Sequence, residues 1–283
     1  MNIFPYFSDC RCIALRSHST KNLATIMKFQ QLKTFLDAKA AHYNTPEFIA
    51  GDPICIPHRF TKLQDIEISG LFAAILAWGN RTTIINKCTE LMKMMDDAPY
   101  DFVLNHKPKE RMKLLRFCHR TFNGVDLMYF VEFLQGYYTD VTSLEFAFSG
   151  HITPEDETVE NALRGFHHMF FLPEHPERTR KHISTPARNS ACKRLNMYLR
   201  WMVRNDENGV DFGLWQHIQP SQLVCPMDVH VGRVATRLGL IPAAKSDWKT
   251  ALALTRQLRQ LDPLDPAKYD FALFGLGVIE KYV

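Results

Sequence analysis

Apolar residues recur three and four positions apart along most of the chain after Met27. This spacing is typical of amphipathic helices, and clusters of Pro, Gly, Asp and Ser separate one such unit from the next. Strand-like alternation is almost absent, apart from the short, ambiguous segment ICIPHRF. Helices are predicted over residues 27–43, 65–78, 82–95, 109–122, 127–139, 158–171, 192–204, 228–240, 247–261 and 268–282. The sequence therefore predicts an all-α fold, without the repeats of about 20 to 50 residues that indicate a solenoid.

Two segments fall outside this helical pattern. Residues 1–26 have no clear helical period, so we interpret them as a flexible extension or as the product of an upstream start codon, with a weak transit peptide as a third interpretation. Residues 172–192, rich in Pro, Arg and Ser, form a long irregular stretch, and such loops inside compact domains are usually functional or disordered. The predicted helical domain is 27–283.

The charge is unevenly distributed along the 283 residues, of which 46% are hydrophobic. Residues 178–204 contain eight Arg or Lys and no Asp or Glu, while the net charge of the whole chain is only +4. A dense local field of this kind is typical of a surface that binds polyanions. The alternative is a loop and a helix face whose charges serve only solvation.

The cysteines and the apolar runs bear on compartment and cofactors. Seven scattered cysteines without a signal peptide indicate a reducing, cytoplasmic compartment. The sequence contains no CxxC pair and no HExxH motif, so we expect no metal and no other cofactor. No apolar run approaches the ~20 residues of a membrane span, so we expect no membrane association.

Lys193 shares a helix face with other cations. On a helical wheel of residues 192–204, Arg200 and Arg204 fall within about 20° of Lys193, while apolar residues gather on the far side. Like charges on one face disfavour protonation of an amine, which makes Lys193 a candidate nucleophile. The alternative is that Lys193 contacts only phosphate or solvent.

Asp228 stands in PMDVH, directly before the helix that Gly239 closes. An Asp in this place is a natural N-cap, because its side chain accepts hydrogen bonds from the first backbone amides. A carboxylate held in this way also stabilises an oxocarbenium ion or accepts a proton from a lysine. Cap and catalytic group are therefore compatible interpretations.

These residues carry a family resemblance. CPMDVHVGRVATRLG resembles the segment that holds the catalytic aspartate of helix-hairpin-helix DNA glycosylases, in the form found in 8-oxoguanine DNA glycosylases, and the helix of Lys193 resembles that of their Schiff-base lysine. GLFAAILAWGNRTTIINKC and KYDFALFGLG agree in order with further family segments, so that the resemblance spans residues 60–280. The chain also resembles a bacterial family, without an assigned activity, that shares CKRLNMYLRWMVR and PMDVH.

The resemblance implies a two-lobed helical fold with a central cleft and a base-excision glycosylase, with or without AP-lyase activity, that acts on damaged double-stranded DNA. Lys193 would be the nucleophile, Asp228 its carboxylate partner and His230 a phosphate contact. Asn80 and Arg81 would occupy the loop that probes the duplex at the lesion. The aromatic candidates for the base pocket are Trp78, Trp201 and Phe274.

The sequence also departs from the family pattern. The glycine-rich hairpin of the family is replaced by STPARNSACKR, so DNA binding would rest on Arg188, Ser190 and Arg194 in addition to Arg200 and Arg204. A long spacer between Lys193 and Asp228 places the chain nearest the archaeal 8-oxoguanine glycosylase branch. WGNR stands where many members carry paired glutamines, which leaves the lesion open. The four-cysteine tail of iron–sulfur members is missing, so we expect no cluster.

Two other classes of function remain open at this point. A noncatalytic nucleic-acid-binding protein on the same fold would use the basic block to recognise shape or single strands. A helical protein-interaction module would have no affinity for DNA at moderate salt. The expected state for the glycosylase is a monomer associated with the nucleoid.

Overall fold

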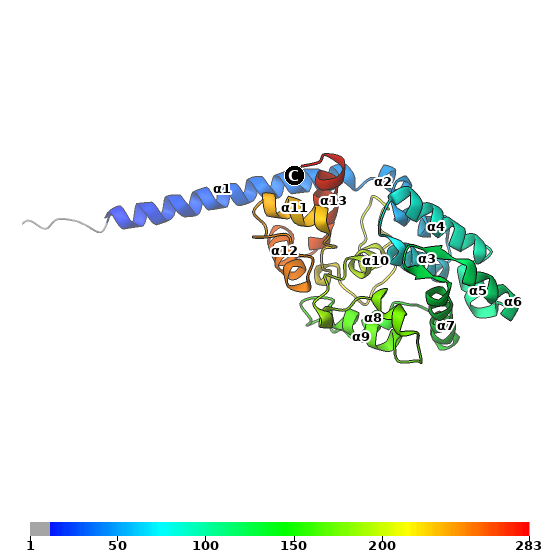
Figure 1. The fold of residues 1–283 in the computed structure, drawn as a ribbon. Coiled ribbons are helices and arrows are strands. Elements are labelled where there is room, and N and C mark those ends of the chain that lie inside the picture. Colours follow the sequence, from blue (N-terminus) through cyan, green and yellow to red (C-terminus); the bar gives the residue numbers. More distant parts are fainter. Residues whose placement is uncertain (1–11, 283) are drawn as a thin grey trace, which may run out of the picture.

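The fold is all-α, as the periodicity predicts. The computed structural model describes residues 12–282, with side chains from residue 28 onwards (Figure 1). The helices, in chain order, are α1 (Cys12–Tyr43), α2 (Pro46–Ala50), α3 (Leu63–Leu76), α4 (Arg81–Met94), α5 (Pro99–Asn105), α6 (Pro108–Lys113), α7 (Gly124–Asp140), α8 (Phe146–Ser149), α9 (Glu160–Phe170), α10 (Lys193–Val203), α11 (Val229–Arg237), α12 (Trp248–Leu261) and α13 (Tyr269–Phe274). A π-helical turn, Gly275–Ile279, follows α13 directly.

Two predicted boundaries were wrong, and the structure resolves one ambiguous segment. Helix α1 begins at Cys12, so residues 12–26 of the predicted flexible extension are helical, while residues 1–11 lie outside the described chain. The helix predicted over 109–122 ends at Lys113 and gives way to a hairpin. The ambiguous ICIPHRF lies across two 3₁₀ turns, Pro53–Cys55 and Pro57–Arg59, because a proline begins each turn.

The hairpin joins strands β1 (Cys118–His119) and β2 (Phe122–Asn123) in antiparallel register, with Cys118 opposite Asn123. In the part of the chain that the structure describes, it is the one β-sheet. Arg120 lies in its two-residue turn with a φ of 57°, in the left-handed region that the turn requires. Phe117 and Phe122 bury the base of the hairpin, which explains why this segment leaves the helical pattern.

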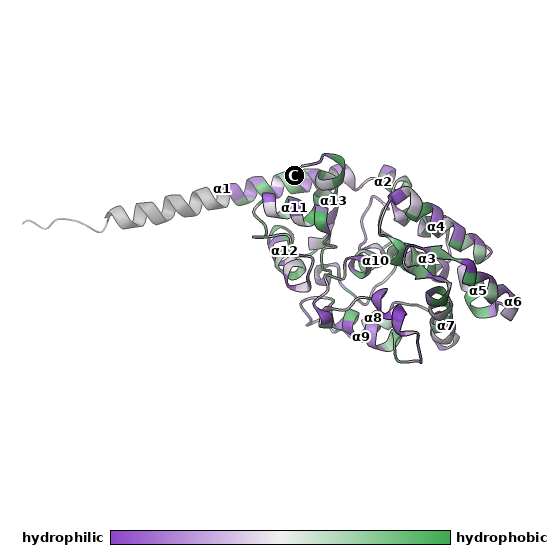
Figure 2. Cartoon of the chain, viewed as in Figure 1, coloured by the Kyte–Doolittle hydropathy of each residue, from purple (hydrophilic) through white to green (hydrophobic). Residues whose placement is uncertain are grey.

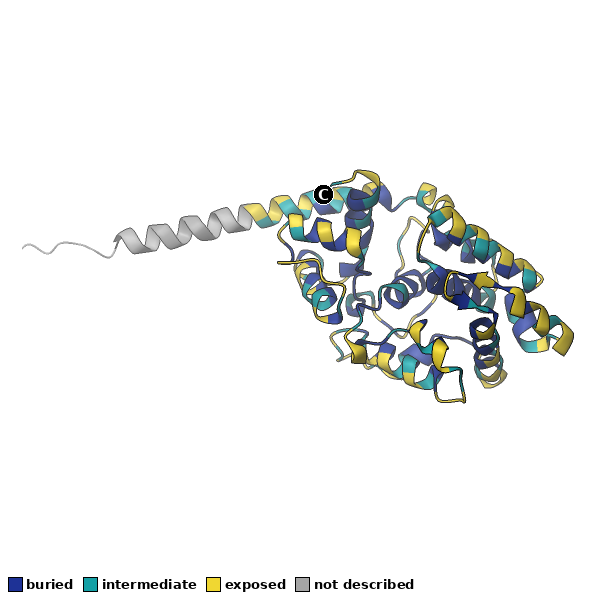
Figure 3. Cartoon of the chain, in the orientation of Figure 1, coloured by how far each residue is buried: buried dark blue, intermediate teal, exposed yellow. Residues whose placement is uncertain are grey.

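Helices α3 and α10 form the centre of the core. Residues 66–76 of α3 and 195–203 of α10 are all buried, and Figure 3 draws both helices almost wholly in dark blue. Figure 2 shows α3 in the green of hydrophobic residues. A Cβ on Gly70 would lie 2.8 Å from the Met202 Cε, so the glycine permits the close approach of the two helices.

Glu67 is the polar exception in this core. Its carboxylate accepts hydrogen bonds from the side chains of Tyr138, Ser143 and Trp215 and from the backbone N–H of Leu144. Buried polar groups are stable only when they are paired in this way. Glu67 therefore joins α3 to distant loops, and it has no remaining acceptor role that would point to a ligand.

Helices from the two halves of the sequence pack together. Helix α13 contacts both α1 and α11, while α10 packs on α3 (Figure 1). This arrangement brings the N-terminal ends of α10 and α11 close to the loop between α3 and α4. None of the helices in residues 12–282 is both long enough and apolar enough to cross a membrane.

Candidate functional site

Lys193 and Asp228, which are 35 positions apart in the sequence, lie side by side on the wall of a cavity. The Lys193 Nζ lies 3.4 Å from the Asp228 Oδ2, and both side chains are partly exposed. The cavity has a volume of about 820 Å³ and is lined by residues of the α3–α4 loop, α10, α11 and α13. The sequence predicts each residue, but only the fold brings them together.

Asp228 is the N-cap of α11. Its Oδ1 accepts hydrogen bonds from the backbone N–H groups of His230 and Val231, at 2.9 and 3.0 Å. The other carboxylate oxygen is left to face Lys193. The predicted cap is therefore confirmed, and it fixes the carboxylate beside the amine.

Lys193 is the first residue of α10. The loop before it, residues 184–192, contains no glycine. Asn189 and Cys192 adopt left-handed backbone conformations, with φ of 54° and 49°, which glycine otherwise favours. The Ser190 Oγ accepts a hydrogen bond from the Cys192 N–H. Cys192 offers no side-chain cap to α10. The first amides of this helix thus face the cavity region with the positive end of the helix dipole.

Three helix N-termini meet at this cavity. Asn80 caps α4 by accepting from the Thr83 N–H, and Arg81, Lys193 and His230 are the lining residues at the starts of α4, α10 and α11. The start of α10 has no side-chain cap and that of α4 has the neutral Asn80, so both offer partial positive charge to an anion, whereas the Asp228 carboxylate already compensates that of α11. The mouth of the cavity is therefore suited to phosphate groups.

The predicted DNA contacts Arg200 and Arg204 were wrong. Both guanidinium groups are buried, with 3% and 4% of each residue exposed. Arg200 forms ion pairs with Asp211 and Asp270, and Arg204 forms ion pairs with Asp206, Asp211 and Asp265. The helical wheel places them correctly on the face of Lys193, but at about 1.5 Å of rise per residue Arg200 lies about 10 Å further along the helix, inside the core.

This correction also removes the like-charge argument for Lys193. The two arginines are neutralised by aspartates from three other segments, so they do not present free positive charge to the amine. The carboxylate of Asp228 is the charged partner at ion-pair distance.

Trp201 was also wrongly predicted to line the pocket. It is fully buried on the core side of α10 and does not reach the cavity. Trp78 and Phe274 do line the cavity, together with Phe48 and Phe271. The Arg81 guanidinium lies 5.0 Å from the centre of the Phe274 ring. The cavity thus has aromatic walls from both ends of the chain.

The remaining predicted DNA contacts differ in their surroundings. Arg188 and His230 are exposed, and Ser190 is half-buried in the loop 184–192. Arg194 lines the cavity but donates a hydrogen bond of 2.6 Å to the Ile75 carbonyl oxygen, which ties α10 to the end of α3. A phosphate contact by any of these four residues stays a prediction.

Two carboxylates of the cavity were missed by the sequence analysis. Burial raises the pKa of Asp270 from its usual 3.8 to about 6, against the attraction of Arg200 and Lys193. Burial also raises the pKa of Asp52, against a backbone hydrogen bond from Ile54 and the attraction of Arg200. Asp270 stands within the apolar run KYDFALFGLG, and an aspartate in such a run could have indicated a buried carboxylate. Asp52 resembles an ordinary turn residue before proline, so the sequence gives no such indication there.

The sequence analysis also missed the contact that the turn between β1 and β2 makes with the cavity wall. The Arg120 guanidinium lies 4.7 Å from the Trp78 ring centre, on the tryptophan that lines the cavity. The Arg178 Nη2 donates a hydrogen bond of 3.1 Å to the Thr121 carbonyl oxygen, and Arg178 also forms an ion pair with Asp126. These contacts hold the hairpin rigidly beside the cavity.

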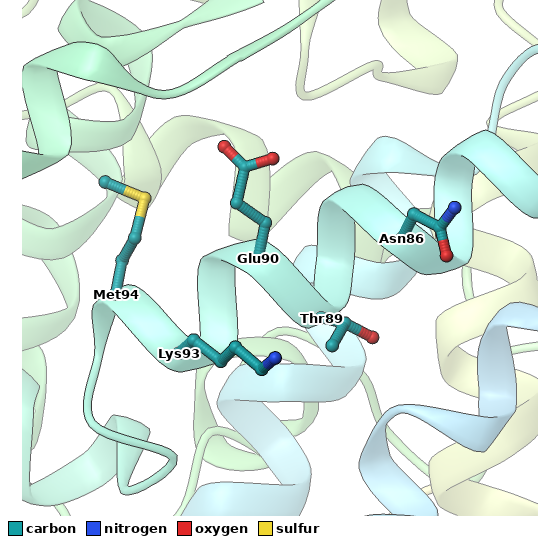
Figure 4. Close-up of a pocket in the computed structure, with 5 residues that line it drawn as sticks. All are labelled: Asn86, Thr89, Glu90, Lys93 and Met94. Carbon is teal, nitrogen blue, oxygen red and sulfur yellow. The ribbon is translucent and has the colours of Figure 1, made fainter.

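A second hollow lies on the outer surface of α4 (Figure 4). All the residues that line it come from this one helix, namely Asn86, Thr89, Glu90, Lys93 and Met94. Groups from different elements do not converge there, so its chemistry is that of an ordinary polar helix surface. In the described residues, no group of three or more His, Cys, Asp or Glu side chains is arranged to hold a metal ion.

The family model described as "protein of unknown function (DUF2400)" matches residues 52–279. The chain belongs to the DUF2400 family. The DUF2400 match begins at Asp52 and includes Lys193, Asp228 and Asp270, so nearly the whole cavity lies within the family region. No curated protein and no solved structure matches the chain.

Proposed function

We propose that this protein is a base-excision DNA glycosylase with AP-lyase activity that acts on damaged double-stranded DNA. The observation that carries the proposal is the approach of the Lys193 Nζ to the Asp228 Oδ2, at 3.4 Å, on the wall of a cavity of about 820 Å³. An amine beside a fixed carboxylate is the pair that covalent catalysis at a sugar carbon needs.

The proposed reaction begins when Asp228 takes a proton from the Lys193 ammonium, and the neutral amine then attacks the sugar C1′. The N–C1′ bond forms while the glycosidic bond breaks; the departing base takes the electron pair, and the proton held by Asp228 passes to it. Asp228 stabilises the positive charge that develops on the sugar. Opening of the sugar gives an imine on Lys193, and loss of a C2′ proton then expels the 3′-phosphate by β-elimination.

The cavity supports a flipped base as the group that enters. The rings of Phe48, Trp78 and Phe274 offer stacking surfaces, which offset the few kcal/mol that extrusion of a base costs. Asp52 and Asp270 add carboxylate acceptors on the cavity wall. Acceptors of this kind suit the N–H groups on the edge of a guanine, so we propose oxidised guanine as the substrate base.

The rim of the cavity supports a phosphate backbone as the group that stays outside. The starts of α4 and α10 contribute partial positive charge, and the exposed Arg188 and His230 add their side chains. Positive charge around an apolar pocket separates the backbone from the base in the way that a glycosylase requires.

Borohydride trapping tests the proposal. Wild type is incubated with duplexes that contain an abasic site or 8-oxoguanine, and reduction converts the imine into a stable adduct. We expect an adduct with wild type and none with Lys193→Gln, while Lys93→Gln, on the outer surface of α4, traps normally. The absence of a wild-type adduct, together with salt-sensitive DNA binding, would favour the noncatalytic binding protein instead.

A further inference from the structure

The connection between α11 and α12, residues 238–247, is hydrogen-bonded to the loop 184–192 that precedes Lys193. The backbone of Ser190 pairs with Asp247 in an isolated β-bridge, and the Trp248 N–H donates a hydrogen bond of 3.1 Å to the Asn189 carbonyl oxygen. On its other side the connection packs on α11, since a Cβ on Gly232 would lie 2.9 Å from the Ala244 Cβ. The connection is thus fixed between two elements of the cavity rim.

This connection and the first turn of α12 carry unpaired positive charge. Lys245 and Lys249 are exposed on either side of the bridge to Ser190, and Arg188 is exposed on the loop 184–192. Within residues 28–282, none of these three cations takes part in an ion pair. Between the two lysines, Ser246 lines the cavity, so the charged strip borders the opening itself.

The acidic residue in this strip does not cancel its charge. The Asp247 side chain is the N-cap of α12 and accepts a hydrogen bond of 2.8 Å from the Thr250 N–H. That bond lowers the pKa of Asp247, and the nearby Lys245 and Lys249 lower it further. Its carboxylate therefore compensates the positive end of the α12 dipole. Both lysine side chains stay exposed to solvent.

We infer that Lys245 and Lys249, together with Arg188, bind the phosphate backbone of the DNA strand whose nucleotide enters the cavity. The inference rests on the proposed function. Three unpaired cations from two joined segments suit a chain of phosphates better than a single small anion, because they are spread along the edge of the opening. The strip adds a second phosphate-binding segment beside the one that the basic block 178–204 predicts.

The test compares Lys245→Ala/Lys249→Ala with Lys93→Ala/Lys109→Ala, which removes two exposed lysines from α4 and α6. In Figure 1, α6 lies at the opposite end of the molecule from α12. Binding to a duplex that contains a stable abasic-site analogue is measured by anisotropy between about 50 and 200 mM salt. We expect the slope of log K against log salt to become shallower by about 2 in the first variant only, with roughly tenfold weaker binding at the low-salt end.

Trapping at saturating DNA separates this inference from the proposed function. The adduct should form in Lys245→Ala/Lys249→Ala at the wild-type rate, because neither lysine reaches the reacting carbon. An unchanged salt slope in this variant, with trapping by wild type intact, would overturn the phosphate strip alone. If wild type does not trap but the slope still becomes shallower by about 2, the glycosylase proposal fails and the strip stands.

Discussion

The two carboxylate oxygens of Asp228 have separate partners, because Oδ1 accepts from the first amides of α11 and Oδ2 lies 3.4 Å from the Lys193 Nζ. Rotation of the carboxylate away from the amine would break both hydrogen bonds to the helix. The local structure that stabilises α11 thus also orients the proposed catalytic pair.

Substitution of Asp228 should separate these two roles. Asn caps helices about as well as Asp, so Asp228→Asn should change the free energy of unfolding by only a few tenths of a kcal/mol, whereas Asp228→Ala should lose about 1 kcal/mol. Both variants should trap on abasic DNA more slowly, by about 100-fold or more, because neither supplies the negative charge. Urea unfolding and trapping rates check the two halves. Wild-type trapping by Asp228→Asn would leave Asp228 as a cap alone.

Arg200 should matter for stability through its buried ion pairs. Arg200→Met leaves Asp211 and Asp270 buried without this partner, which should cost about 3 to 5 kcal/mol of unfolding free energy. Arg188→Met, at an exposed position, should stay within about 0.5 kcal/mol of wild type. Urea titrations compare the two variants. Equal stability of both would show that the buried ion pairs contribute little to the fold.

The contact between Arg120 and Trp78 should contribute a small, measurable stabilisation. Removal of an exposed cation–π contact costs about 0.5 to 1 kcal/mol, so Arg120→Ala should unfold at correspondingly lower urea concentration. Arg116→Ala removes an exposed arginine from the preceding turn and is the matched control. An equal loss in both variants would mean that the stack on Trp78 is not a source of stability.

Gly79 should resist substitution because of its backbone. Its φ is 111°, and a Cβ there would lie 2.9 Å from the Arg120 Nη1. Gly79→Ala should therefore cost about 1 to 2 kcal/mol. Gly209→Ala, at a φ of 66° with open space around it, is the control, because alanine costs less in the left-handed region than at 111°. If the two alanine variants lose the same stability, neither the φ of Gly79 nor the approach of Arg120 adds to the cost.

Asp270 should give the stability a characteristic pH dependence. Burial raises the pKa of Asp270 in the folded protein to about 6 from its usual 3.8, so between these values the folded state binds more protons than the unfolded state. Stability from this group is complete below about pH 4 and is lost as the pH rises through 6. The advantage of wild type over Asp270→Asn should therefore shrink across this range. Urea unfolding at several pH values measures it, with Asp140→Asn as the exposed control; a constant difference would contradict the shift.

Features that depend on neighbours in the sequence were predictable. The helical period gives the all-α fold, and the cap at Asp228 follows from a polar residue between a proline turn and an amphipathic helix. The hairpin of β1 and β2 was missed because its stability comes from the burial of Phe117 and Phe122 and from the distant Arg178.

Features that depend on depth in the fold were not predictable. The wheel of residues 192–204 shows which side chains share a face, but it does not show that one end of the helix is at the surface and the other in the core. Arg200 and Arg204 were therefore predicted as DNA contacts, although their aspartate partners come from residues 206–270. The approach of Lys193 to Asp228 likewise required the packing of α10 and α11.

Helix α10 is held at both ends, by Arg194 on the Ile75 carbonyl near its start and by the paired arginines near its finish. Lys193 therefore begins a helix that is anchored at both ends, and its amine changes position through rotation of its own four-carbon side chain. The rest of the alignment of the reacting atoms must then come from the incoming molecule, which has to bend toward this helix. Discrimination between ligands would follow from how easily each one deforms.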